Sequence, residues 1–242
     1  MPCFSSLRTG IVLIALTLTL AGCVTAPNVE ADKANLKRVK RVALLDLHTQ
    51  DAAMVQNFGL AGGLGMIGGA IEGATNDDNS KTFTAAIAQH KPSLNDALVA
   101  SVSQSLKDSG FEVTVIGDQK PKKAADGKSD DFSDIHVDAD AILVVWAPLR
   151  GYISPPHSFN YEPQVMIRAH LVDATTKKDL YFKTFFVGYK AAVINEDDIP
   201  SESRYRYRSV DTLLSQAADA ADGLISCETI GAHRIAADLK GN

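Results

Sequence analysis

ADAILVVWAP, residues 139–148, is the stretch that decides the fold class. Apolar residues follow one another without alternation from Ala141 to Ala147, and Pro148 ends the run. A continuous apolar run of this length, closed by a proline, is typical of a buried strand in the middle of a sheet. We therefore expect a central strand at 139–148 and look for its partners on either side.

Three other segments supply further strands. QVMIRAHLVDATTKKDLYFKTFFVGY, residues 164–189, predicts two strands around the turn ATTKK, because apolar residues alternate on both sides of it. FEVTVIG, residues 111–117, alternates in the same way. RVALLDLH, residues 41–48, is rich in leucine and β-branched residues. The sequence thus predicts about five strands.

Two helices are expected between and after these strands. PSLNDALVASVSQSLKDSG, residues 92–110, has Ser93 and Asp96 at capping positions and Gly110 as a natural stop. A long helical pattern begins at Ser209, and we expect it to break or bend near Gly223 or Gly231. The order of elements predicts an α/β fold with a mixed sheet and with helices packed mainly on one face, in a single domain over 39–242.

The N-terminus has the features of an export signal. Arg8 precedes an apolar run from Ile11 to Gly22, which as a helix is about 18 Å long and too short for a bilayer core of about 30 Å. The run ends in Leu20-Ala21-Gly22-Cys23, which resembles the bacterial lipobox. The resemblance implies removal of residues 1–22 and acylation of Cys23, with residues 23–38 as lipidated N-terminus and tether. An ordinary secretory signal with a chance cysteine is the alternative.

The residue after Cys23 is Val24 rather than Asp. In lipoproteins of enteric bacteria an Asp at this position is an inner-membrane retention signal. The resemblance therefore implies an outer-membrane protein, lipid-anchored on the periplasmic face. Its partner would be the membrane itself, reached through the acyl chains.

Charge and cysteine content narrow the function further. The chain carries a formal net charge of −5, and loss of Arg8 with the signal makes it one unit more negative. A mildly acidic body argues against a nucleic-acid partner. Once Cys3 is removed and Cys23 is acylated, Cys227 is left without a disulfide partner. Its place in an apolar helical pattern favours a small buried side chain over a reactive thiol.

GLAGGLGMIGGAIEG, residues 59–73, contains the spacing of a dinucleotide-binding fingerprint. Such a glycine turn follows its strand at once, whereas residues 49–57 intervene here. A Walker-type loop at Gly127-Lys128-Ser129 also fails, because position 122 is a lysine instead of a glycine. We therefore expect no nucleotide cofactor.

The same stretch repeats small residues at every fourth place: Ala61, Gly65, Gly69 and Gly73. On a helix these residues share one face, which lets another helix approach closely, above all in lipid. From Phe58 to Thr75 the only charged residue is Glu72. A glycine-zipper-like insert at 58–75 that packs on a second copy or partly enters the membrane is one interpretation, and a flexible glycine loop is the other.

No catalytic or metal-binding pattern is apparent in the sequence. The six histidines are scattered, and none has the i, i+4 spacing of a helical zinc site. DDFSDIHVDAD, residues 130–140, offers oxygen ligands of the kind calcium takes, but it lacks the turn glycine of the standard loop. We interpret it as a solvated lead-in to the central strand, and we expect a protein that is not an enzyme and holds no metal.

A ligand-binding rim is the remaining candidate site. RYRYR, residues 204–208, alternates Arg204, Arg206 and Arg208 with tyrosines, a pattern that can grip a sugar, a lipid headgroup or a peptide carboxylate. Tyr152 and His157 flank the Pro155-Pro156 break and would add to this rim. A polar edge before the last helix is the alternative interpretation of RYRYR.

Over roughly residues 40–240, the helix leading into GFEVTVI and the hairpin HLVDATTKKDLYF resemble small periplasmic lipoproteins. The similar proteins are those related to the N-terminal domain of the Tol-system protein TolB and to the curli-secretion lipoprotein. The resemblance implies a role in assembly or in the envelope, without catalysis. Together with the glycine repeat at 58–75, it leads us to expect a non-enzymatic assembly, transport-accessory or envelope-interaction module that acts as a homo-oligomer or with other envelope proteins. A periplasmic lipid- or glycan-binding lipoprotein is the alternative.

Overall fold

The computed structural model describes residue 29 and residues 33–47, 51–58, 65–125, 129–155, 158, 160–188 and 198–241. The expected signal peptide, Cys23, Ala61 and His157 lie outside the described residues. Within the expected insert 58–75, the backbone is described at Phe58 and from Gly65 onward, and side chains at Phe58 and from Gly73 onward.

The described helices are α1 (Lys33–Leu36), α2 (Gly65–Ile87), α3 (Leu94–Asp108), α4 (Val210–Ser215) and α5 (Ala217–Lys240). The described strands are β1 (Arg41–Leu45), β2 (Met54–Asn57), β3 (Glu112–Ile116), β4 (Lys122–Lys123), β5 (Asp130–Asp131), β6 (Ala141–Ser154), β7 (Glu162–Asp173), β8 (Asp179–Gly188) and β9 (Asp198–Ile199).

The main sheet is mixed, as the sequence predicts. Its seven described strands lie in the order β3-β1-β6-β7-β8-β9, with β2 also paired to β6. β3, β1 and β6 run parallel, and β6, β7 and β8 run antiparallel. The strands expected from the sequence are β1, β3, β6, β7 and β8, while β2 and β9 are additional. The small ribbon of β4 and β5 is separate from this sheet.

β6 is longer than its apolar run predicts. The expected end at Pro148 is wrong, because the strand continues to Ser154. The register against β7 shifts between Trp146 and Leu149, so Pro148, which has no N–H to donate, lies in a bulge. The added length lets β6 pair with β1 along its first half and with β2 along its second half.

The helix predicted at 92–110 is confirmed as α3. The Ser93 side chain accepts a hydrogen bond from the backbone N–H of Asp96, as an N-cap does. The Asp51 carboxylate accepts hydrogen bonds from the N–H groups of Leu94 and Asn95, which have no partner within the helix because they lie in its first turn. Gly110 follows the last turn with a φ of +95°, a conformation that favours glycine.

The expected break of the last helix at Gly223 or Gly231 is wrong. The helical pattern is interrupted at Gln216, between α4 and α5, and α5 then runs unbroken from Ala217 to Lys240. The two glycines are contact points instead. A Cβ on Gly223 would lie 2.4 Å from the Tyr152 hydroxyl, and one on Gly231 would lie 2.3 Å from Cδ1 of Ile167. Their missing side chains let α5 lie close against the sheet.

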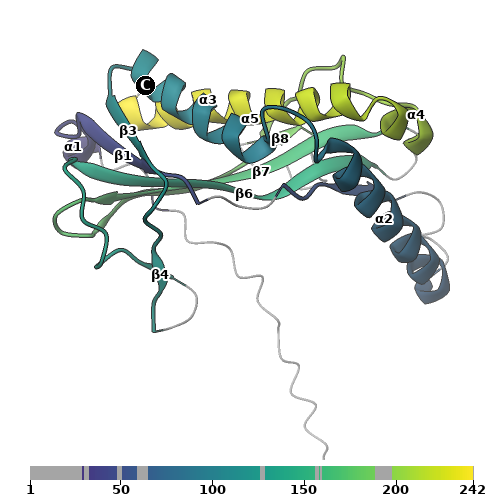
Figure 1. Ribbon diagram of the computed structural model, residues 1–242, viewed down its shortest axis with the longest axis horizontal. Coiled ribbons are helices and arrows are strands. Elements are labelled where there is room, and N and C mark those ends of the chain that lie inside the picture. The colour runs from purple at the N-terminus through teal and green to yellow at the C-terminus, as the bar shows by residue number, and fades with distance from the viewer. Residues whose placement is uncertain are drawn as a thin grey trace, which may run out of the picture.

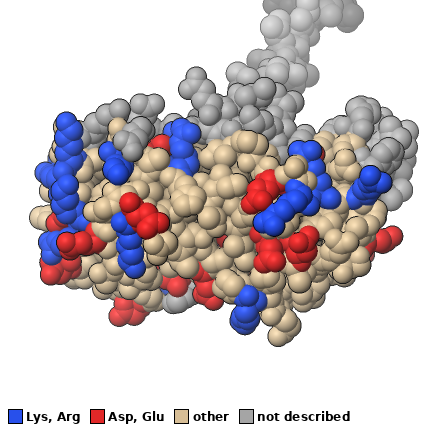
Figure 2. Space-filling view, turned by 90° about the horizontal axis from the view of Figure 1, so that it is seen from above, with Lys and Arg blue, Asp and Glu red and all other residues tan. Residues whose placement is uncertain are grey.

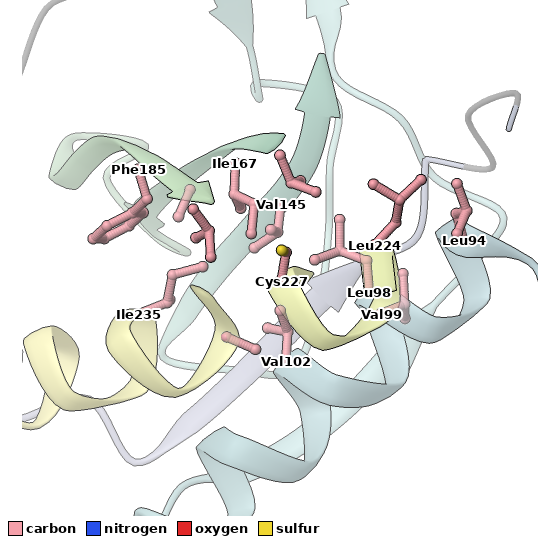
Figure 3. Close-up of a cluster of buried hydrophobic side chains, with 14 of the residues drawn as sticks. Leu94, Leu98, Val99, Val102, Val145, Ile167, Phe185, Leu224, Cys227 and Ile235 are labelled. Atoms are coloured by element: carbon pink, nitrogen blue, oxygen red, sulfur yellow. The ribbon is translucent and has the colours of Figure 1, made fainter. Parts of the chain in front are cut away.

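The helices α3 and α5 form one layer over one face of the sheet (Figure 1). Seen from above, the outer surface of this layer carries clusters of both charges with neutral surface between them (Figure 2). Beneath it lies the main core, where Cys227 and Leu224 of α5 meet Val102 of α3 and where Val145 and Ile167 rise from the sheet (Figure 3). This arrangement confirms the expectation of helices packed on one face.

The opposite face of the sheet is covered at one end. Phe132 and Ile135, from the segment 130–140 expected to be a solvated lead-in, pack on Ile142, Val144 and Val172. The ribbon of β4 and β5 precedes these two residues and lies below the sheet in Figure 1. A second, smaller core therefore seals this end.

A ladder of polar side chains joins α2 to the outer edge of β2. Thr84 Oγ1 accepts from the Ala53 N–H at 3.1 Å, and Ser80 Oγ accepts from the Val55 N–H at 2.8 Å. Asn76 Oδ1 accepts from the Asn57 N–H at 3.0 Å. Four helical residues rise about 6.0 Å and two strand residues about 6.6 Å, so the two repeats match. The helix thereby satisfies an edge that another strand would otherwise extend.

We expect Ser80→Ala to lower the free energy of unfolding by about 1–2 kcal/mol, because the half-buried backbone groups of Val55 lose their partner. Chemical denaturation and amide hydrogen exchange at Val55 measure the effect. Thr82→Ala is the control, since the exposed Thr82 hydroxyl bonds only a carbonyl of its own helix. Equal losses in both variants would contradict a role for the ladder.

Candidate functional site

The region around Tyr152, expected to line a ligand rim, is filled. The Tyr152 side chain is completely buried, and its ring meets the edges of Phe83 at 5.8 Å and of Tyr207 at 5.3 Å between centroids. Its hydroxyl donates to the carbonyl of Ala220 on α5 at 3.0 Å. Burial raises the pKa of Tyr152 well above its ordinary value. Tyr152 therefore ties the sheet to α5 and lines no opening.

The RYRYR segment is anchored by its tyrosines. Tyr205 and Tyr207 are buried, while Arg204, Arg206 and Arg208 are exposed. Arg204 pairs with Glu202 at 2.9 Å and lies over the Tyr205 ring, and Arg206 approaches Glu162 at 3.6 Å. The segment consists of turns and bends, with a single β-bridge from Tyr207 to Tyr161. It forms no strand that would place the three arginines on one face.

The glycine-rich stretch is helical from Gly65 onward, as the N-terminal half of α2. Ala61 lies outside the described residues, and at Gly65 and Gly69 only the backbone is described. Gly73 is exposed, and a Cβ there would meet nothing within 4 Å. α2 is 23 residues long, yet none of the helices in the described ranges is long and apolar enough to cross a membrane.

The carboxylates of the 130–140 run have structural partners. Asp130 pairs with Lys123, and Asp134 pairs with Lys122. Asp138 and Asp140 both bind the Arg41 guanidinium. Asp140 also accepts the backbone N–H groups of Lys40 and Arg41, bonds that hold the pKa of its carboxyl below the ordinary value. Among the described residues, no group of three or more His, Cys, Asp and Glu side chains could hold a metal ion.

A buried ion pair lies under α5. Arg150 of β6 donates through Nε to Oε1 of Glu228 at 2.5 Å, and both side chains are almost completely inaccessible. Arg150 Nη2 and Glu228 Oε2 have no hydrogen-bond partner. Burial raises the pKa of Glu228 to about 7, although Arg150 acts to lower it. A pair enclosed in this way has no route to a substrate, so it is a structural element whose charge depends on pH.

Cys227, next to Glu228, is buried and carries no disulfide. Burial raises the pKa of its thiol to about 12, so the thiolate needed for reactivity is not formed near neutral pH. The interpretation of Cys227 as a small core side chain is confirmed.

The face of the sheet opposite α3 and α5 carries a surface that the sequence did not reveal. Cross-strand register aligns Trp146 of β6, Arg168 of β7 and Thr184 of β8 in one row. A neighbouring row consists of Leu149, Met166 and Phe186. Phe182 lies beside Trp146, with ring centroids 6.2 Å apart. We call these seven residues the open face, because each remains partly exposed.

Two polar atoms within the open face lack partners. Arg168 Nε and Thr184 Oγ1 are each buried without a hydrogen bond, although their residues lie directly opposite one another. Among the described residues, none forms an ion pair with Arg168. The open face therefore combines a mostly apolar surface with one cationic group at its centre. Neither hydropathy nor spacing points to it, because its members come from three strands.

No family model matches the sequence, and no curated protein matches it. Solved structures that resemble the chain include protein XCC0632 from Xanthomonas campestris, at 10% identity and a TM-score of 0.42, covering 88% of this chain and 92% of that one. Lipoprotein GNA1162 from Neisseria meningitidis is 13% identical with a TM-score of 0.31, covering 65% and 88%. A PelC dodecamer from Paraburkholderia phytofirmans is 10% identical with a TM-score of 0.31, covering 82% and 94%. None of these likenesses decides what the chain does.

The Glu228 pKa predicts a pH-dependent contribution to stability. Between about pH 4.5 and 7 the folded state holds a proton that the unfolded chain has lost, so this contribution falls as the pH rises through that window. Relative to Glu228→Gln, the free energy of unfolding of the parent protein should fall by up to roughly 3 kcal/mol across it.

Denaturation at a series of pH values measures this difference, and Glu112→Gln on the exposed side of β3 is the control. A difference that stayed flat or rose with pH would show that Arg150 keeps Glu228 ionised throughout.

Proposed function

We propose that the chain is a bacterial lipoprotein held by acyl chains on Cys23 at the periplasmic face of the outer membrane. Residues 1–22 would be the signal, 23–38 the lipidated tether and 39–242 the periplasmic body. The lipobox-like Leu20-Ala21-Gly22-Cys23 is the observation that carries this proposal. Within the proposed tether, Val29 exchanges two backbone hydrogen bonds of 2.9 Å with Phe182 at the edge of β8.

The body would serve as a non-enzymatic assembly or interaction module. Its most unusual polar groups have structural roles: Tyr152 fastens α5, Arg150 pairs with Glu228 inside the protein, and Cys227 is buried as a neutral thiol. Carboxylates in the acidic run pair with Lys122 and Lys123. A ligand-binding role remains the second candidate, moved from the filled rim at Tyr152 to the open face.

Contact with a second copy would occur through the glycine-rich half of α2. This half runs beyond the edge of the sheet in Figure 1, and residues 73–75 are exposed. Each glycine in a helix costs about 1 kcal/mol relative to alanine, and Gly65, Gly68, Gly69 and Gly73 all lie here. Packing against a partner helix would offset that cost, because small residues allow close approach.

We expect mass spectrometry of the mature protein to find Cys23 as the N-terminal residue, carrying acyl chains. Cys23→Ala should block this processing and keep the precursor at its full length, because the acylated sulfur is the group that signal cleavage requires. A mature chain with an unmodified thiol at position 23, or an uncut Met1, would refute the lipoprotein proposal.

We also expect chemical crosslinking of the lipidated protein to trap an oligomer. Gly69→Leu should remove most of the crosslinked oligomer, because the leucine side chain would hold two helices apart. Ala86→Leu, exposed on the other half of α2, is the matched control and should leave the yield unchanged. A protein that remains monomeric, or an oligomer indifferent to Gly69→Leu, would remove the oligomer proposal.

A further inference from the structure

We propose that the open face binds an anionic phospholipid of the membrane that carries the anchor. The lipid phosphate would contact Arg168 and Thr184, and its acyl chains would lie on Trp146, Phe182 and their apolar neighbours. This inference rests on the proposed acylation of Cys23. It adds to the acyl anchor a second contact, made by the folded body.

The open face contains two polar atoms without hydrogen-bond partners. Arg168 Nε and Thr184 Oγ1 are buried without partners, and leaving such a group unpaired costs about 1–3 kcal/mol. Buried polar groups in native proteins are rarely left unpaired, so each of these atoms requires an explanation, and an absent partner supplies one for both. Both residues are partly exposed, so rotation of their side chains would let Arg168 donate to an anionic oxygen and the Thr184 hydroxyl donate to another oxygen of the same group. A phosphate diester fits this pair because it presents several strong acceptors within a small volume.

Apolar side chains surround Arg168 on the open face. Trp146 lies opposite it on β6, and Met166 and Phe186 form the adjacent row across β7 and β8. A charge at the centre of such a surface matches a ligand with one anionic group and attached apolar chains. A glycan offers hydroxyl groups on every ring, and this surface has few polar atoms to pair with them. The chemistry of the open face therefore favours a lipid.

The tether brings the lipid source within reach. Val29 is paired with Phe182, which is itself part of the open face. Six residue steps separate Cys23 from Val29, and a fully extended chain spans at most about 3.6 Å per residue, or roughly 22 Å. The attachment point at Cys23 is therefore confined to within about 22 Å of Val29, which is hydrogen-bonded to Phe182. The surrounding lipids are held at a high local concentration next to this surface.

Trp146 provides a direct probe because it is the only tryptophan of the chain. The lipidated full-length protein is reconstituted in vesicles of phosphatidylcholine alone, or with added phosphatidylglycerol, each with or without bromine on the acyl chains. We expect brominated phosphatidylglycerol to quench most of the Trp146 emission. Brominated phosphatidylcholine should quench much less, because its own choline ammonium competes with Arg168 for the phosphate and leaves the headgroup without net charge.

Two variants test the phosphate contact. Arg168→Gln should weaken the response to phosphatidylglycerol about tenfold, the change that corresponds to loss of about 1.4 kcal/mol. Thr184→Val keeps the shape of the side chain and should weaken the response in the same direction. Circular dichroism shows that each variant is folded. The control is Trp146→Phe combined with Ala218→Trp, which moves the fluorophore to an exposed position on α5 and should abolish quenching.

Each outcome has a distinct meaning. Equal quenching by both lipids, unchanged in Arg168→Gln, would overturn recognition of an anionic headgroup. An absence of quenching with Cys23 acylated, as mass spectrometry of the same sample shows, would overturn this inference and leave the proposed anchor standing. If Trp146 emission changed with protein concentration and did not respond to the lipid composition, the open face would be a contact surface for a second copy of the chain. An unmodified Cys23 would remove the anchor and this inference together.

Discussion

The close approach of α5 to the sheet is the constraint on which the rest of the structure depends. Gly223 and Gly231 provide flat positions where Tyr152 and Ile167 lie against the helix, and a Cβ at either glycine could fit only if these neighbouring side chains moved. Between these points, the side chains of Cys227 and Leu224 are completely buried. Protein interiors are packed as densely as organic crystals, so these side chains occupy the space between α5 and the sheet.

The close packing of α5 on the sheet also explains why several chemically reactive groups are buried. Groups that would suggest a reactive site in an isolated sequence, such as a cysteine beside a glutamate, are enclosed under α5 and serve the fold. The opposite side of the same strands is sealed at one end by Phe132 and Ile135. Toward the β8 edge it carries a mixture of aromatic side chains and a single guanidinium. The open face thus lies on the side of the sheet that α3 and α5 do not cover.

Much of the fold could be predicted from the sequence, because its signals are local. Unbroken or alternating apolar residues predicted the strands β6, β7 and β8, and Ser93 with Gly110 predicted both ends of α3. Predictions failed where tertiary contacts override local signals. Pro148 suggested a strand end, but the bulge carries β6 onward and places Tyr152 in the core. Gly223 and Gly231 suggested a bend, whereas packing against the sheet uses their lack of side chains.

The candidate site was less accessible to sequence reasoning than the fold. The open face depends on cross-strand register, which brings Trp146, Arg168 and Thr184 together from positions up to 38 residues apart in the chain. Hydropathy also missed the second half of α2, because Asn76, Ser80 and Thr84 have the polarity of a solvent-facing side and yet bond the backbone of β2. That helix has a protective consequence. Its hydroxyl and amide groups bond the outer edge of β2. Local unfolding of α2 would therefore expose the unpaired backbone groups of this strand and favour aggregation through strand pairing between molecules.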